Sequence, residues 1–247
     1  MLEAKELSVY YGKRPVLHGL SFTVEKGSVT ALLGLNGSGK STLLSAIGGA
    51  LPYEGSLLFE GVPLACLSPR ERAVRLSLLP QILPTPPFTV AETVLCGREP
   101  YLTLAHRPSS EDARIADEAM ALTGIAPLRE RRLSSLSGGE RQMAFLAMTL
   151  AQKAPLLLLD EPTSFLDKVK EKHFLSTLAA ARQKEGLTVL AAMHDITAAM
   201  RFADRFLILG GGKLLFDGER EALLRTELVE KTFGVRRYDT PDGPVFV

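Results

Sequence analysis

The fold is decided by one run of eight residues, Gly34-Leu35-Asn36-Gly37-Ser38-Gly39-Lys40-Ser41. It follows a short β-prone apolar run, Val29 to Leu33, and it precedes Ser41 to Ile47, whose apolar spacing predicts a helix. Strand, glycine-rich turn and helix in this order satisfy the pattern G-x-x-x-x-G-K-[ST] in the setting that it requires. Glycines let backbone N–H groups approach a phosphate closely, and the positive end of the helix adds to the attraction. We expect Lys40 to reach the β and γ phosphates of a nucleotide and the Ser41 hydroxyl to bind Mg²⁺.

Apolar runs and helical stretches alternate through the rest of the chain. Leu156 to Leu159, Thr188 to Ala192 and Phe206 to Leu209 are strand-sized, and Lys170 to Gln183 and Ile196 to Ala203 read as helices between them. Strands that are apolar on both faces suit a buried parallel sheet. The order therefore predicts a doubly wound α/β core with a mostly parallel sheet.

The N-terminal region departs from this order. Leu7 to Tyr11 and Leu20 to Val24 alternate apolar and polar residues, and Ser56 to Phe59 follows a glycine turn. Alternation is typical of strands with one solvated face, so we expect an antiparallel β subdomain beside the phosphate-binding loop.

Strand signals are lacking from about Pro84 to Leu136. In this stretch either Ser109 or Ser110 can cap a helix that runs through Thr123. The sequence predicts a single domain, with residues 1–83 and 137–247 forming the core and residues 84–136 an inserted helical subdomain.

Composition restricts the class of protein. The 247 residues are 46% hydrophobic, with 29 Lys+Arg against 28 Asp+Glu and a net charge of +1. This balance excludes disorder and does not suggest a nucleic-acid partner. No uncharged apolar run approaches the ~18 residues of a membrane-spanning helix, and the first residues lack the layout of a secretory signal. Cys66 and Cys96 have no metal-type spacing, so we expect reduced, structurally neutral thiols.

Two carboxylates end the run Leu156-Leu157-Leu158-Leu159-Asp160-Glu161. Asp160 is placed to hold Mg²⁺ and Glu161 to polarise an attacking water. An acidic pair after a strand can equally serve as a cap, but the presence of a phosphate-binding loop favours the catalytic interpretation.

A second glycine-rich turn, Leu136-Ser137-Gly138-Gly139-Glu140, precedes an apolar helical run. In the structural interpretation, Ser137 caps the helix and Glu140 completes a capping box. The same geometry is also a second anion site, because a glycine-rich helix start with a free hydroxyl attracts phosphate.

Taken together, these motifs resemble the ATP-binding cassette family, and the resemblance covers essentially the whole length. It implies an ATPase in which two copies pack head to tail, so that each ATP lies between the phosphate loop of one copy and Ser137 to Gly139 of the other. It implies Gln81 as a Mg²⁺ contact and His194 as a sensor of the γ phosphate. The residues that it makes catalytic are Lys40, Gln81, Glu161 and His194, and the metal ligands are Ser41, Gln81 and Asp160.

The resemblance also supplies the nucleotide contacts. Tyr11 matches the aromatic residue that stacks on adenine, with Val16 alongside, although the neighbouring Tyr10 competes for this role. Ser164-Phe165-Leu166-Asp167 takes the place of the dimer-contacting loop, with Phe where a small residue or His often stands. The full set of expected contacts is Tyr11, Val16, Asn36, Gly37, Ser38, Gly39, Lys40, Ser41, Thr42, Ser137, Gly138, Gly139, Glu140 and Asp167.

Several further stretches resemble importer subunits for iron siderophores, haem or cobalamin. They are Pro86-Pro87-Phe88-Thr89-Val90, Gly97-Arg98-Glu99-Pro100-Tyr101, Met193-His194-Asp195-Ile196 and Ala203-Asp204-Arg205. The implied assembly is a homodimer on the cytoplasmic face of the inner membrane, with integral-membrane permease subunits and a separate solute-binding protein. An exporter ATPase, or a cassette ATPase in repair, translation or iron–sulfur assembly, is the alternative.

Overall fold

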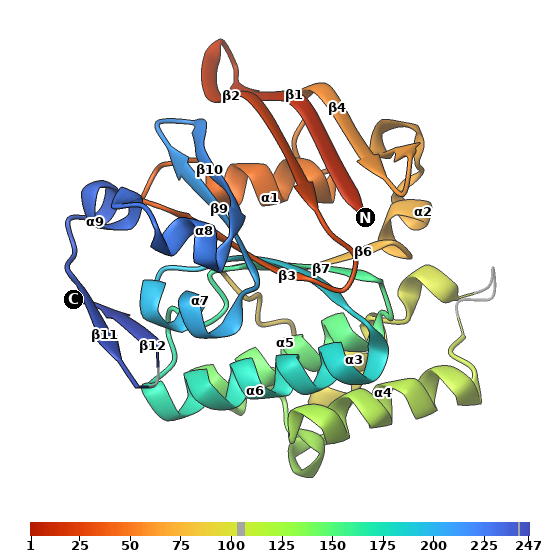
Figure 1. The fold of residues 1–247 in the computed structure, drawn as a ribbon. Helices are drawn as coiled ribbons and strands as arrows, with labels where there is room; N and C mark the ends of the chain where they lie inside the picture. Colours follow the sequence, from red (N-terminus) through yellow and green to blue (C-terminus); the bar gives the residue numbers. More distant parts are fainter. Residues whose placement is uncertain (103–106, 242) are drawn as a thin grey trace. The chain divides into compact units, whose positions relative to one another are not determined.

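The computed structural model describes residues 1–102, 107–241 and 243–247, which form two compact units (Figure 1). The first unit contains Met1–Leu67, Leu158–Glu161 and Thr188–Val247. The second contains Ser68–Leu157 and Pro162–Leu187.

A mostly parallel sheet forms the core of the first unit. Its central strand β3 (Val29–Gly34) pairs in parallel with β8 (Thr188–Ala192) on one side and with β9 (Arg205–Gly210) on the other. Strand β7 (Leu156–Asp160) follows β8 in the sheet, and β10 (Lys213–Glu219) pairs antiparallel with β9 at the opposite edge. Every residue of β3, β7 and β8 is buried. The predicted α/β core is confirmed.

The antiparallel sheet expected near the N-terminus is also present. Its strand order is β2 (Arg14–Val24), β1 (Leu2–Tyr11), β4 (Glu54–Phe59) and β5 (Val62–Pro63). Alternate residues of β1 and β2 are buried, as the pattern in the sequence predicts for strands with one solvated face.

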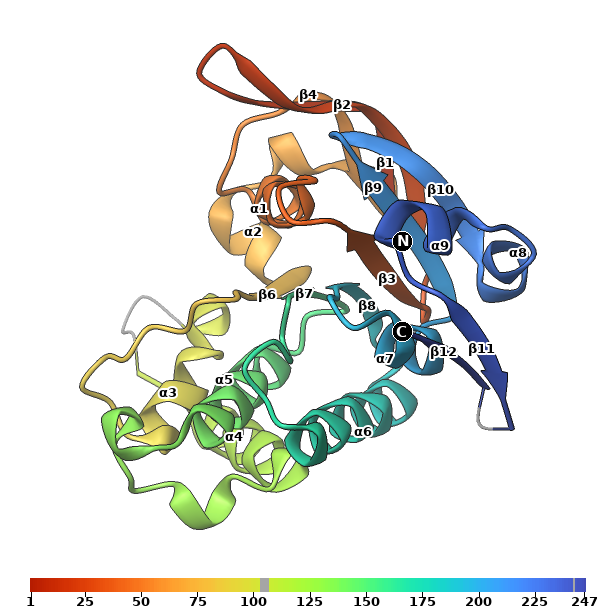
Figure 2. The same ribbon diagram turned by 90° about the vertical axis from the view of Figure 1, so that its left-hand side faces the viewer.

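The helices of the first unit include α1 (Lys40–Gly48), which follows β3, and α7 (Ile196–Phe202), which follows β8. Beyond β10 the chain forms α8 (Arg220–Leu224), α9 (Leu228–Phe233) and a hairpin of β11 (Arg237–Thr240) and β12 (Gly243–Phe246). The hairpin packs beside α7 (Figures 1 and 2).

Helices dominate the second unit (Figure 2). They are α2 (Pro69–Ala73), α3 (Val90–Cys96), α4 (Ser110–Thr123), α5 (Gly138–Ala151) and α6 (Lys168–Glu185), with short 3₁₀ turns at Glu99–Tyr101, Ala126–Leu128 and Leu133–Ser135. Helices α3 and α4 both pack on α5. Strand β6 (Leu76–Leu79) follows β7 in the sheet order, and the Leu156 amide donates to the Arg75 carbonyl at 3.2 Å.

Serine and threonine side chains begin four of these helices, and Ser68 caps the shortest of them, α2. Ser109, rather than Ser110, caps α4, Thr89 caps α3 and Ser137 caps α5, and each forms a capping box with the acidic residue three positions on. Between 84 and 136 the described residues form no named strand, only an isolated bridge between Thr89 and Arg132. None of the helices in the described ranges combines the length and the apolarity that a membrane crossing requires.

Candidate nucleotide site

The phosphate loop, Gly34 to Ser41, connects β3 to α1 in a conformation that depends on glycine. Gly37 and Gly39 have φ values of 77° and 104°, in the left-handed region that other residues rarely adopt. A Cβ on Gly34 would lie 2.4 Å from Ser38 Oγ and 2.6 Å from the Leu209 carbonyl oxygen. The start of α1 carries no side-chain cap. Its first N–H groups and the helix dipole therefore form an anion site.

Two polar groups are buried in this loop. Ser38 is 5% exposed, and within the described part of the chain its hydroxyl has no hydrogen-bond partner. Lys40 is also 5% exposed, and its Nζ donates to the Gly34 carbonyl at 2.8 Å and lies 3.6 Å from Glu161 Oε1. A buried ammonium and an unsatisfied hydroxyl beside free helix N–H groups fit the oxygens of a phosphate.

The Ser41 hydroxyl donates to Asp160 Oδ1 at 2.9 Å, so the two predicted metal ligands lie together. Burial raises the pKa of Asp160, with the nearby Glu161 carboxylate adding to the shift, while the Ser41 hydrogen bond and Lys40 act in the opposite direction. Hydroxyl and carboxylate oxygens are hard donors that suit Mg²⁺. In the described ranges no group of three His, Cys, Asp or Glu residues could hold a metal by itself. The pair therefore fits a Mg²⁺ ion that takes its other ligands from phosphate and water.

Glu161 follows β7 with φ at 47°, an uncommon value for a residue with a side chain. Its amide donates to the Ala192 carbonyl at 3.0 Å, so hydrogen bonding to the end of β8 holds the strained conformation. Its side chain is 14% exposed and points toward Lys40. Strain of this kind costs about 1–3 kcal/mol and is often found at functional sites.

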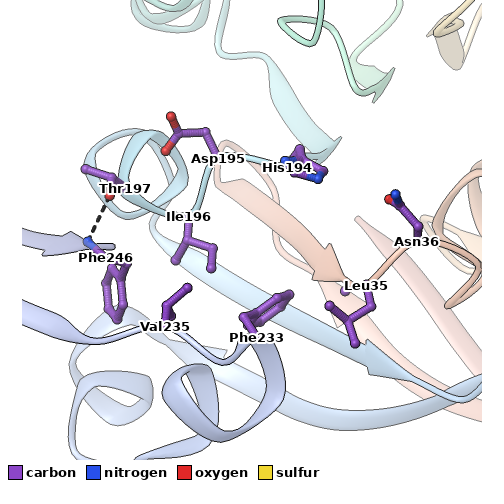
Figure 3. Close-up of a pocket in the computed structure, with 10 residues that line it drawn as sticks. Leu35, Asn36, His194, Asp195, Ile196, Thr197, Phe233, Val235 and Phe246 are labelled. Carbon is purple, nitrogen blue, oxygen red and sulfur yellow. Dashed lines mark hydrogen bonds between the residues drawn. The ribbon is translucent and has the colours of Figure 1, made fainter.

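His194 is exposed after β8 and lines a pocket of about 640 Å³ in the first unit (Figure 3). This His194 pocket is formed by Gly34, Leu35, Asn36, His194, Asp195, Ile196, Thr197, Phe233, Val235 and Phe246. The Phe246 amide donates to Thr197 Oγ1 at 3.0 Å, which joins β12 to α7. Phe233, Val235 and Phe246 were not predicted. The signal available for them was a pair of short apolar stretches, Phe233 to Val235 and Val245 to Val247, with a mostly polar run, Arg236 to Thr240, between them.

Tyr11, the candidate for stacking on adenine, is the last residue of β1, and Val16 lies near the start of β2. Tyr11 is 55% exposed and Tyr10 is 39% exposed, so both tyrosines remain candidates. Val16 lies beside the phosphate loop, because its Cγ1 would be 3.7 Å from a Cβ on Gly39. Thr42 is on the first turn of α1.

The remaining predicted site residues belong to the second unit. The Ser137 amide donates to Glu140 Oε2 at 2.7 Å, and this bond lowers the pKa of Glu140. Gly138 and Gly139 open α5. Gln81 follows β6, and Asp167 caps α6 by accepting a hydrogen bond from the Lys170 amide at 2.9 Å.

The predicted site residues are divided between the two units. The first unit holds Tyr11, Val16, Asn36, Gly37, Ser38, Gly39, Lys40, Ser41, Thr42, Asp160, Glu161 and His194, and the second holds Gln81, Ser137, Gly138, Gly139, Glu140 and Asp167.

Comparison with known proteins identifies the family of the chain. The ABC transporter family model matches residues 17–164. The chain is 40% identical over 247 aligned residues to a hemin import ATP-binding protein of Bradyrhizobium diazoefficiens, an alignment that covers 95% of this chain and 89% of that protein. It is 36% identical to the ferric enterobactin transport ATP-binding protein of Escherichia coli, with 95% of this chain and 88% of that protein covered. A bacterial ABC transporter cassette solved as a dimer superimposes with a TM-score of 0.79 at 25% identity, covering 89% of this chain and 99% of that one. With its phosphate loop and paired carboxylates in place, the chain belongs to the ABC transporter family.

Proposed function

We propose that this chain powers the uptake of an iron–siderophore complex or haem by hydrolysing ATP between two copies of itself. The observation that carries the proposal is the convergence of Lys40, Ser41, Asp160 and Glu161 at the carboxyl ends of β3 and β7. Ligands of open α/β sheets bind at these strand ends.

Each residue of this cluster has a distinct task in the proposal. The phosphate-loop amides and Lys40 bind the β and γ phosphates, while Ser41 and Asp160 hold Mg²⁺, with Gln81 as a further ligand. Bound Mg²⁺ neutralises charge on the phosphate oxygens. Glu161 accepts a proton from the attacking water as general base, and His194 contacts the γ phosphate. Either Tyr11 or Tyr10 stacks on the adenine, a contact worth about 1–3 kcal/mol per base.

In the proposed dimer, the second glycine-rich turn of each copy binds the ATP held by the other copy. Ser137 caps α5, Gly138 and Gly139 open it, and Glu140 completes the capping box. The backbone N–H groups at this helix start would bind the phosphates of the ATP held by the other copy. Asp167, a further expected contact, belongs to the same unit. ATP then bridges two copies, and hydrolysis removes the bridge.

The proposed partners follow from the relatives. The chain would lie on the cytoplasmic face of the membrane as a peripheral subunit, bound to integral-membrane permease subunits through the helical segment 84–136. A separate solute-binding protein would deliver the solute. The relatives named above import hemin or transport ferric enterobactin, which supports an iron-containing solute; the cobalamin expectation has no counterpart in those two names.

The substitution Glu161→Gln tests the catalytic assignment. The amide keeps the shape of the side chain but cannot accept the proton, so we expect ATP binding and dimer formation to persist while phosphate release falls by about 10²–10⁴-fold. Measurements would be phosphate release and light scattering with MgATP. Glu60→Gln is a matched control, because Glu60 is an exposed glutamate with a similar φ of 48°. Near-normal turnover by the Glu161 variant would remove Glu161 as the general base.

A further inference from the structure

The segment after β8, which carries His194, is held on both sides of that residue. Before it, the Met193 amide donates to the Leu32 carbonyl at 3.1 Å, which fixes the chain against β3. After it, Asp195 caps α7 by accepting a hydrogen bond from the Ala198 amide at 2.8 Å. His194 lies between these two anchors and is exposed, so the position of its imidazole depends on where α7 begins.

The C-terminal hairpin of β11 and β12 adds a third anchor from outside this segment. The Phe246 amide donates to Thr197 Oγ1 at 3.0 Å, on the first turn of α7. Figure 3 shows Phe246 beside Thr197, while His194 lies on the side of Asn36 from the phosphate loop. Backbone hydrogen bonds make a helical turn move as a unit, so a displacement of the hairpin would reach His194 through the start of α7.

The hairpin lies apart from the main sheet and is itself held in place. Strands β11 and β12 form a separate two-stranded sheet, and α7 is the principal described element against which they pack. Arg237 Nη1 donates to the Leu224 carbonyl at 2.6 Å, and the Arg236 amide donates to the Val247 carbonyl at 2.8 Å. A fixed hairpin whose main contact is α7 is suited to hold the start of that helix.

We propose that this hairpin is a positioning element for His194. The hydrogen bond from Phe246 to Thr197 holds the start of α7 so that the imidazole stays directed toward the nucleotide site. Thr197 and Phe246 are then positioning residues, which act through His194 and do not touch the nucleotide. The inference rests on the contact of His194 with the γ phosphate that is proposed above, but its structural part can be tested without any nucleotide.

NMR of the histidine rings tests that structural part in the full, nucleotide-free chain. The sequence has 4 histidines, so labelling with ¹³C-histidine gives few ring signals, and His194→Gln identifies the signal of His194. Thr197→Val keeps the shape of the side chain and removes the oxygen that accepts from Phe246. We expect the His194 signal to shift and broaden in this variant while the signals of the other histidines stay in place. Thr197→Ser keeps the oxygen and should return the His194 signal to its parental position.

A second variant removes the same hydrogen bond from the donor side. Phe246→Pro lacks the N–H group, and proline can be accommodated because this amide donates to Thr197, outside the hairpin. We expect it to move the His194 signal in the same direction as Thr197→Val does. Thr188→Val is the matched control, because Thr188 in the same unit also accepts a backbone hydrogen bond, from the Gly27 amide at 2.9 Å. It should leave the His194 signal unchanged.

ATP hydrolysis gives the second readout. We expect Thr197→Val to lower kcat about tenfold and to leave the KM for ATP within about twofold, because the phosphate loop and the adenine contact remain. Thr197→Ser and Thr188→Val should keep kcat within about twofold of the parent. In a His194→Gln background, Thr197→Val should change kcat by less than about twofold, since a residue that acts through His194 has no effect once His194 is lost.

The outcomes separate this inference from the proposed function. A His194 signal that stays in place in both Thr197→Val and Phe246→Pro would overturn the positioning role. An equal loss of kcat from Thr197→Val with and without His194 would also overturn it, because the hairpin would then act on general stability or on another group. Near-parental turnover by His194→Gln would instead overturn the γ phosphate contact, and the NMR signal would still decide whether the hairpin holds the imidazole.

Discussion

At the scale of single residues, Asp160 is a carboxylate that suits a metal ion but lowers the stability of the folded protein when no metal is bound. Burial raises its pKa, which means that the ionised carboxylate opposes folding at neutral pH. We expect Asp160→Asn to raise the melting temperature of the ligand-free protein by about 2–4 °C, because the amide can still accept from Ser41 without a buried charge. The same substitution should abolish the extra stabilisation that MgATP gives over ATP alone. Thermal unfolding with and without MgATP measures both effects.

The control for this prediction is Asp217→Asn, which changes an aspartate that pairs with Arg205 away from the loop. It should leave the MgATP stabilisation intact. In the parent protein, the raised pKa of Asp160 means that its carboxylate becomes protonated at a higher pH than an ordinary aspartate does. As the pH is lowered, the stabilisation by MgATP should therefore begin to fall above the ordinary aspartate pKa. A MgATP effect that survives in Asp160→Asn would argue against a metal ligand at this position.

At the scale of elements, Arg98 connects α4 and α5 of the second unit with the short 3₁₀ turn at Glu99–Tyr101. Its Nε donates to Asp112 Oδ1 at 2.9 Å, its Nη1 donates to the Ala151 carbonyl at 2.8 Å, and its guanidinium carbon lies 4.0 Å from the centre of the Tyr101 ring. Arg98 is 6% exposed, so this side chain of the Gly-Arg-x-Pro-Tyr stretch is occupied by contacts within the chain. Hydrogen bonds from the Ser109 hydroxyl and amide, together with Arg98, lower the pKa of Asp112.

Arg98→Ala leaves the buried carboxylate of Asp112 without its cation and should destabilise the second unit by about 3 kcal/mol. Urea unfolding followed by circular dichroism measures the loss. Arg114→Ala is the control, since Arg114 pairs with Glu111 and Glu118 on the exposed side of α4, where such pairs contribute about 0–1 kcal/mol. Because the pKa of Asp112 is lowered on folding, its contribution is present above the ordinary aspartate pKa and is lost as the pH falls through the lowered value. Equal losses of unfolding free energy for the two variants would show that the buried Arg98 contributes no more to stability than an exposed ion pair does.

Several elements could be predicted from the sequence because their signals are local. Strands β3, β7, β8 and β9 are short apolar runs with clear ends, and the cap of α5 belongs to a contiguous motif, Ser137 to Glu140. Strand β10 could not be found in this way, because its residues alternate between exposed and partly exposed, and its pairing with β9 defines it. Strand β6 has only four residues.

Some parts of the candidate site could likewise be predicted from local sequence, and others could not. The phosphate loop and the pair after β7 are contiguous in sequence, so their chemistry can be inferred before any fold is known. The His194 pocket brings together residues about 200 positions apart in the chain, such as Leu35 and Phe246, and only tertiary structure reveals it. Whether Ser109 or Ser110 caps α4 was likewise open in the sequence, because both are good caps.

At the scale of the whole molecule, charge predicts how the chain reaches a membrane. The 29 basic and 28 acidic residues leave a net charge of +1, and anionic lipid attracts a protein by about 1 kcal/mol for each basic residue held near its surface. With so small an excess, we expect little binding to vesicles of phosphatidylglycerol at physiological salt, whereas vesicles that contain the permease should retain the chain. Flotation on a density gradient measures both. Strong binding to the permease-free vesicles, reversed by high salt, would instead identify a basic surface as the anchor, because screening removes lipid attraction and leaves a protein interface largely intact.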